Sequence, residues 1–241
     1  MNIKELFLDA VKYAASDWTK FILLGILFVS VDLLDRTTTE DIIPFNLWLV
    51  LMGILVIVFF IQAGYVFRII ETSAIDESDE LPPFNNIKDL FKHGVKDSAV
   101  VMCYIIFPVA LLALSTGITI AYINTDIPLK FPIIITLIFG IISVIFFIFM
   151  QAAILNMVHN HGKIRSAFNF KQIYGKIREI GVKKFLIVCL LTGIIFLIIE
   201  PFLLDDLRGS LDFYGGTILE FIVAPYLAIL TSRFLGTMAR H

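Results

Sequence analysis

Six long apolar runs constrain this chain more than any other feature of its sequence. They lie approximately at Trp18–Leu34, Phe45–Ile70, Ala99–Ile123, Phe131–Val158, Phe185–Leu204 and Thr217–Leu235. Each is close to or above the length of about 17–25 residues that a helix needs to cross a bilayer. The runs are continuous rather than alternating, which favours helices over barrel strands, because in lipid every backbone group must be bonded within its own segment. The sequence therefore predicts an all-α integral membrane protein with six transmembrane helices.

Composition agrees with a membrane protein. Hydrophobic residues make up 59% of the chain and charged residues 17%, whereas a soluble domain has about 45–50% apolar and about 25% charged residues. The net charge of −2 gives no overall attraction to nucleic acid, so no nucleic-acid partner is expected. The only two cysteines, Cys103 and Cys189, lie inside apolar runs. They predict small buried hydrophobes rather than a disulfide or a metal site.

The distribution of basic residues predicts the orientation. Of the 19 Lys and Arg residues, 16 lie at the two termini or in the second and fourth loops, and only Arg36, Lys130 and Arg208 lie in the other loops. Cytoplasmic loops carry the excess of Lys and Arg. We therefore expect a multi-pass protein of the cytoplasmic membrane with both termini in the cytoplasm, whose inner face attracts anionic headgroups.

A short segment occurs three times. Asn2–Phe7 recurs as Asn86–Phe91 and as Asn169–Tyr174, at spacings of 84 and 83 residues. In each copy the Asn can cap a helix, and an acid or amide three positions later can complete a capping box. Apolar residues follow at helical spacing, which predicts three amphipathic helices lying in the inner interface with their apolar sides in the acyl boundary. A soluble cytoplasmic bundle of these helices is the alternative.

The repeat predicts one membrane domain, 1–241, built from three units. The units cover approximately 1–75, 84–162 and 167–241, and an acidic, proline-containing cytoplasmic linker, 76–83, follows the first. Each unit is an interfacial helix followed by a two-span hairpin, so all three have the same orientation. Parallel repeats are related by an axis along the membrane normal. We therefore predict a pseudo-threefold bundle.

Several stretches resemble a mainly archaeal family of multi-span membrane proteins, catalogued as the domain of unknown function number 4013. The stretches that carry the resemblance are Gly64–Arg68, Asp76–Phe84, Leu90–Lys96, Ser166–Phe170 and Ser232–Gly236. The Glu-Leu-Pro core of the second stretch is fairly specific, although here Ser78 interrupts its acidic run and Pro83 adds a second proline. The resemblance implies a multi-span membrane protein and supplies no catalytic residues.

Two sets of residues are candidate functional sites. Breaks and polar groups inside the spans are candidates to line a pathway, and they are Gln62, Pro108, Ser115, Thr116, Gln151 and Pro225. Structural kinks and interhelical hydrogen bonds are the alternative explanation. Candidate headgroup contacts are Lys4, Lys88, Lys171, Asn156 and His159. The acidic linker could bind a divalent cation, but a solvated loop that ends one helix and orients the next is favoured, because Pro82 and Pro83 cannot continue a helix.

No familiar catalytic motif occurs in the sequence, so an enzyme, such as one that modifies lipids, is the least favoured function and no cofactor is expected. The leading hypothesis is transport or permeation of a small solute or amphiphile near the pseudo-threefold axis. The alternative is a non-catalytic membrane-organising or accessory subunit that binds lipid or a protein partner through its basic interfacial helices. A wet central cavity would favour the first, and a dry apolar centre with an exposed apolar flank would favour the second.

Overall fold

The computed structural model describes residues 2–39, 44–76, 78–123, 130–207, 210–211 and 213–240, and within these ranges all regular structure is helical. The α-helices are α1 (Ile3–Ala14), α2 (Trp18–Thr39), α3 (Phe45–Ile75), α4 (Ile87–Ile123), α5 (Lys130–His159), α6 (Phe170–Ile180), α7 (Val182–Ile194) and α8 (Phe213–Arg240). A 3₁₀ turn, η1 (Ile164–Phe168), precedes α6, and two π-helical segments, η2 (Ile195–Ile199) and η3 (Phe202–Leu207), follow α7.

Four helices are long and apolar enough to cross a membrane, namely α3, α4, α5 and α8. They contain the second, third, fourth and sixth predicted spans, so the chain is a multi-pass membrane protein. The first predicted span lies in α2, which has 22 residues but includes the charged residues Lys20, Asp32, Asp35 and Arg36. The fifth begins in α7, which ends after 13 residues, where the π-helical segments follow.

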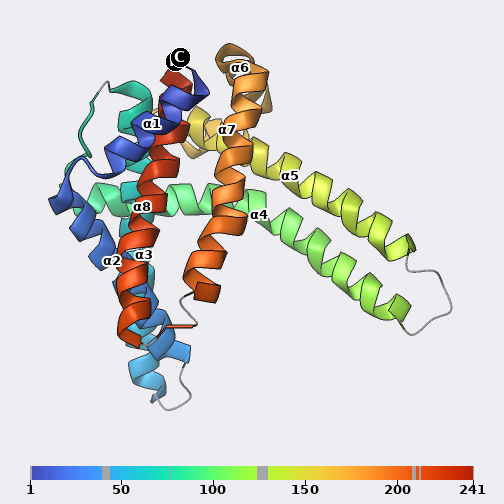
Figure 1. The fold of residues 1–241 in the computed structure, drawn as a ribbon, viewed down its shortest axis with the longest axis horizontal. Helices are drawn as coiled ribbons and strands as arrows, with labels where there is room; N and C mark the ends of the chain where they lie inside the picture. The colour runs from blue at the N-terminus through green and yellow to red at the C-terminus, as the bar shows by residue number, and fades with distance from the viewer. Residues whose placement is uncertain are drawn as a thin grey trace.

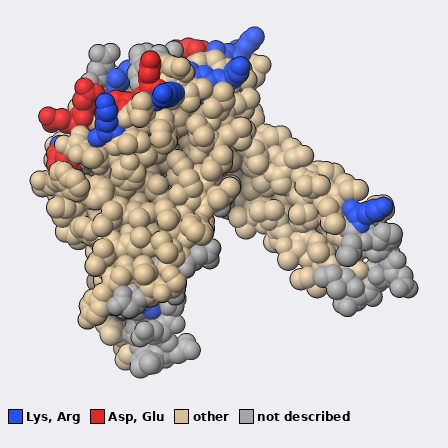
Figure 2. Space-filling view, in the orientation of Figure 1, with Lys and Arg blue, Asp and Glu red and all other residues tan. Residues whose placement is uncertain are grey.

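Helix α8 is the centre of the packing. It contacts α1, α2, α3, α5, α6 and α7, and its second half is almost completely buried. Around it, a core of fully buried side chains joins α1, α3, α5, α7 and α8, and includes Leu6, Phe67, Leu155, Phe185 and Phe234. Figure 1 shows α1, α6 and the C-terminus gathered at the same end of α8. We call this end of the molecule the charged end, because most visible charged side chains lie there in Figure 2.

The α4 and α5 hairpin extends away from the helices around α8 (Figure 1). The hydroxyls of Ser115 and Thr136 lie 2.6 Å apart, and Phe107 stacks on Phe146 at a centroid distance of 4.7 Å, so the two helices hold each other. Large apolar side chains of the hairpin are exposed, including Ile106, Ile133, Leu137 and Ile141. Exposed apolar surface of this extent suits a lipid environment rather than water.

Three helices begin directly after the repeated asparagines, as predicted. The Asn2 N–H donates to Glu5 Oε2 at 2.8 Å, and Asn169 Oδ1 accepts from the Gln172 N–H at 3.2 Å.

However, the second predicted interfacial helix is not separate, because α4 continues without a break from Ile87 to Ile123. Asp17 caps the start of α2 by accepting from the Thr19 and Lys20 N–H groups, and Gly181, with φ 97°, separates α6 from α7. Gly94, Asp97 and Ser98, which precede Ala99, lie within α4 and do not interrupt it.

The predicted placement of the apolar stripes in the acyl boundary is wrong for part of each stripe. The equivalent residues Leu6, Leu90 and Ile173 are all 0% exposed, because α1 packs on α8, the start of α4 packs on α3, and α6 packs on α5. The neighbouring apolar edge of each helix is exposed, as Phe7, Ile87 and Phe170 show. Each amphipathic segment therefore uses one apolar edge for the protein core and leaves another on the surface.

Candidate functional site

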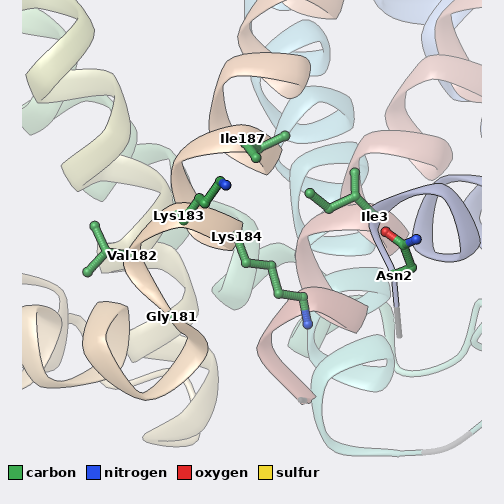
Figure 3. Close-up of a pocket in the computed structure, with 7 residues that line it drawn as sticks. All are labelled: Asn2, Ile3, Gly181, Val182, Lys183, Lys184 and Ile187. Carbon is green, nitrogen blue, oxygen red and sulfur yellow. The ribbon is translucent and has the colours of Figure 1, made fainter.

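A pocket of about 490 Å³ opens at the charged end between the start of α1 and the start of α7. Its lining consists of Asn2, Ile3, Gly181, Val182, Lys183, Lys184 and Ile187. Figure 3 shows Lys184 extending from α7 toward Asn2 and Ile3 at the start of α1. Two lysines and three residues with branched apolar side chains thus line the pocket.

Gly181 explains why Lys183 and Lys184 lie at the start of a helix. Glycine adopts a positive φ, here 97°, without steric cost. Gly181 is therefore able to end α6 and to precede the first residue of α7. Lys183 and Lys184 consequently lie in the first turn of α7, which contains no acidic residue. The first N–H groups of a helix lack intrahelical partners and carry a partial positive charge. The first turn of α1 differs, because the Glu5 carboxylate accepts from the Asn2 N–H there, so the start of α7 and the two lysines supply the positive charge of the pocket.

Neither lysine of the pocket is neutralised by a described residue. No ion pair joins Lys183 or Lys184 to an acidic side chain in the described part of the chain. Burial lowers the pKa of Lys184 below its usual range, since partial removal from water disfavours the charged form. An anion in the pocket would offset this desolvation.

The predicted headgroup contacts separate into two groups. Lys4, Lys88 and Lys171 are exposed at the starts of α1, α4 and α6. Asn156 is only 5% exposed, and its amide donates to the Ser166 carbonyl at 2.8 Å. The Nδ1 atom of His159 lies 2.9 Å from the carbonyl oxygen of Leu155 on its own helix. Asn156 thus holds the turn after α5, whereas His159, which is half-buried, contacts its own helix.

The predicted acidic linker has exposed acidic side chains at Asp76, Asp79 and Glu80, as a solvated loop does, but its backbone is bonded to the helices around it. We call residues 76 and 78–85 the strap. Six side chains from α1, α2, α3 and α8 donate to its backbone carbonyls: Arg240 to Asp76, Arg233 to Ser78, Tyr13 to Glu80, Lys20 to Leu81, Tyr65 to Pro82, and Arg68 to both Pro83 and Asn85. Leu81 is 1% exposed, and Phe84 stacks on Tyr65 at 3.6 Å between ring centroids. No three His, Cys, Asp or Glu side chains converge as metal ligands within the described residues.

Arg233 is the largest of the fully buried side chains and was not singled out by its sequence pattern. Its Nε donates to Asp9 Oδ2 at 2.8 Å and its Nη1 to the Ser78 carbonyl at 2.8 Å, while its guanidinium lies 4.2 Å from the centre of the Tyr13 ring. These partners lie far from it in the sequence. The sequence signals were a basic residue inside the last apolar run and its place in Ser232–Gly236, one of the stretches that carry the family resemblance.

The six candidate pathway residues do not form one lining. Pro108, Ser115 and Thr116 belong to α4, whose second half extends away from α8 (Figure 1). Thr116 is exposed, and its hydroxyl donates to the Leu112 carbonyl on its own helix at 3.0 Å. Gln151 of α5 and Pro225 of α8 are buried.

Gln62 and Pro225 are the two pathway candidates that lie at a similar depth. Gly236 of α8 packs against Ser73 of α3, since a Cβ on Gly236 would lie 2.5 Å from the Cβ of Ser73. The two helices run in the same direction, and Gln62 and Pro225 each precede this contact by the same number of residues. The Oε1 atom of Gln62 is buried and has no hydrogen-bond partner among the described residues.

Comparison with known proteins identifies the family. The family model described as "Protein of unknown function (DUF4013)" matches residues 47–204, well over half of the chain. No curated protein matches the chain, and no solved structure does. The matched range includes the strap, the whole α4 and α5 hairpin, and the two lysines of the pocket. The chain therefore belongs to the DUF4013 family of proteins of unknown function.

Proposed function

We propose that this protein is a non-catalytic, membrane-organising subunit that binds anionic lipid headgroups at its charged end. The pocket between α1 and α7 carries this proposal, because Lys183 and Lys184 line it and neither has an acidic partner among the described residues. An anionic phosphate matches both lysines and the start of α7, which they share. An acyl chain matches the apolar side chains of Ile3, Val182 and Ile187.

Other features of the charged end support a lipid-binding face. Lys4, Lys88 and Lys171 are exposed there. On α6, the exposed Phe170 and Tyr174 lie one turn apart, and the Arg178 guanidinium lies 5.6 Å from the centre of the Tyr174 ring. Aromatic and basic side chains of this kind are typical of the membrane interface. The proposal places this end, with both termini, at the cytoplasmic leaflet, where the anionic lipids attract basic segments.

A cyclic arrangement of the three units is part of the proposal. The amphipathic segment of each unit packs on the last helix of another unit: α1 on α8, the start of α4 on α3, and α6 on α5. This order closes a ring of contacts, which supports the predicted pseudo-threefold relation at the charged end. In this arrangement six spans would carry three equivalent cytoplasmic segments, each offering an exposed lysine to the headgroups.

Lipid retention tests the proposal. The full-length protein is reconstituted in vesicles of phosphatidylcholine with a minor share of phosphatidylglycerol, extracted gently, and its bound lipids are counted by mass spectrometry. We expect enrichment of phosphatidylglycerol, and we expect its loss in the double variant Lys183→Gln/Lys184→Gln. Attraction to anionic lipid is worth about 1 kcal/mol per lysine, so the enrichment should fall by roughly tenfold or more.

A matched control separates the pocket from general charge. Lys92→Gln/Lys163→Gln removes the same charge from two exposed positions outside the pocket, and it should retain most of the enrichment. Equal losses in the two double variants would show that surface charge alone attracts the lipid, and absence of enrichment in the parent protein would overturn the proposal.

Transport of a small solute is the second candidate function. The observation that favours it is the unpartnered Oε1 atom of Gln62, buried at the depth of Pro225. A proline inside a helix frees a backbone carbonyl, and broken helices line binding sites in many transporters. Flux of a solute through the same vesicles, abolished by Gln62→Met with normal folding, would favour this function over the first.

A further inference from the structure

A half-buried carboxyl on α4, that of Asp97, has no role in the proposed lipid site. The Oδ1 atom of Asp97 is enclosed by the protein and has no hydrogen-bond partner among the described residues. Asp97 precedes the apolar run that begins at Ala99, and it lies one turn after Gly94, which packs against Phe60 of α3. Unpartnered buried carboxylates are rare, because polar atoms in protein interiors are nearly always hydrogen-bonded.

The sequence repeat shows how unusual this side chain is at its position. At the spacings of 84 and 83 residues, Asp97 corresponds to Tyr13 in the first unit and to Ile180 in the third. Both are uncharged and buried, with exposures of 3% and 7%. The second unit therefore carries a carboxyl at a position that the other two units use for packing. Packing alone does not explain an acid there.

Two titratable side chains on the same face of α4 connect Asp97 to the surface. Asp89, His93 and Asp97 are spaced four residues apart, which places them in a row along the helix. Asp89 is 40% exposed, and its Oδ2 atom lies 3.6 Å from Nδ1 of His93, which is 17% exposed. Exposure thus decreases from Asp89 to His93, and the row ends at the enclosed oxygen of Asp97.

The charged groups around this row do not neutralise Asp97. On α3, Arg68 pairs with Asp89 at 3.1 Å, and Glu71 is close enough to Asp89 and His93 to interact with their charges. Lys96 points toward the turn after α5, since its Nζ lies 3.9 Å from the place of a Cβ on Gly162. His161 and Lys163, on either side of Gly162, are exposed. None of these groups forms an ion pair with Asp97 within the described residues.

We propose that Asp97 is a proton-binding site, loaded from the charged end along the row of Asp89 and His93. An ionised carboxylate with an enclosed oxygen that has no partner is costly, and a bound proton removes this cost by making the group neutral. The proton comes from water at the surface and resides on the Asp97 carboxyl. The site needs no counter-ion and no ligand other than the proton.

Infrared spectroscopy of the full-length protein in lipid nanodiscs tests the proposal. At neutral pH the spectrum should contain the C=O stretching band of a protonated carboxylic acid. This band should disappear in Asp97→Asn and remain in Asp76→Asn, which removes an exposed carboxyl. If Asp97→Asn does not fold, Asp97→Glu provides the same information, because it should shift the band rather than remove it.

Exchange kinetics test the route. His93→Gln should leave the band in place at equilibrium but slow its shift after transfer to deuterium oxide by tenfold or more. Unchanged exchange would overturn the proposed route. A spectrum at neutral pH without any protonated band that depends on Asp97, or carboxylate bands of Asp97 that respond to replacing sodium by potassium, would overturn the proton site itself. These outcomes are independent of lipid enrichment.

Discussion

At the scale of single residues, Arg233 shows how one buried charge joins distant parts of the chain. It links α8 to Asp9 of α1 and to the Ser78 carbonyl of the strap, and it is 1% exposed. Arg233→Met keeps the apolar stem but removes every donor. Hydrogen bonds to a charged group are worth about 1.5–3 kcal/mol, and the 30% exposure of the Asp9 side chain lets water compensate part of the loss. We expect destabilisation by about 2–3 kcal/mol, measured as denaturant unfolding in detergent.

The matched control is Arg165→Met, at an exposed position of η1. Surface replacements of this kind change stability by about 0.5 kcal/mol or less. If both variants unfold at the same denaturant concentration, the strap does not depend on Arg233. Arg233→Lys should be intermediate, because an ammonium cannot reproduce the fork of the guanidinium.

At the scale of elements, the crossing of α3 and α4 depends on two glycines. A Cβ on Gly64 would lie 1.8 Å from the Leu90 carbonyl oxygen, and a Cβ on Gly94 would lie 1.8 Å from that of Phe60. Backbone atoms cannot move aside as a flexible side chain can, so Gly64→Ala or Gly94→Ala must separate the helices. Overpacking typically costs about 1–3 kcal/mol, and we expect the upper part of this range, read as a lower thermal midpoint and a smaller folded fraction.

Gly53 provides the comparison within α3, because a Cβ there would meet nothing within 4 Å. Gly53→Ala should be neutral or stabilising by up to about 1 kcal/mol, since alanine favours a helix. Tolerance of alanine at all three positions would contradict the close crossing.

At the scale of the whole molecule, the gathering of charged side chains at one end predicts its orientation (Figure 2). In a variant with the exposed Cys103 replaced by Ala, single cysteines at Lys130 and Ser210 should react with a membrane-impermeant thiol reagent added to intact cells. Cysteines at Ser78 and Lys163 should react only after the cells are opened. The expectation follows from the excess of basic residues on the side of Ser78 and Lys163. Labelling of Ser78 in intact cells would reverse the orientation.

Local features of the sequence determined the helical class, four of the long apolar helices, the family, and the three helix starts after Asn2, Asn86 and Asn169. These features depend on side-chain hydropathy and on hydrogen bonds between residues three or four apart. The residues of a short segment are therefore sufficient to determine them. The separate second interfacial helix was predicted wrongly for the same reason. The segment contains a helix start, and the residues that could have ended the helix before the following apolar run, Gly94, Asp97 and Ser98, lie within one continuous helix.

Only the tertiary structure decided which apolar edge of each amphipathic segment faces protein, how the strap is held, and which lysines share a pocket. The donors to the strap come from α1, α2, α3 and α8, and the pocket joins Ile3 to Lys184. Asp97 was likewise inconspicuous in the sequence, because an acid beside an apolar run is ordinarily solvated. Its enclosure depends on the packing of neighbouring helices, and contacts between distant segments are set by the fold as a whole rather than by any local pattern.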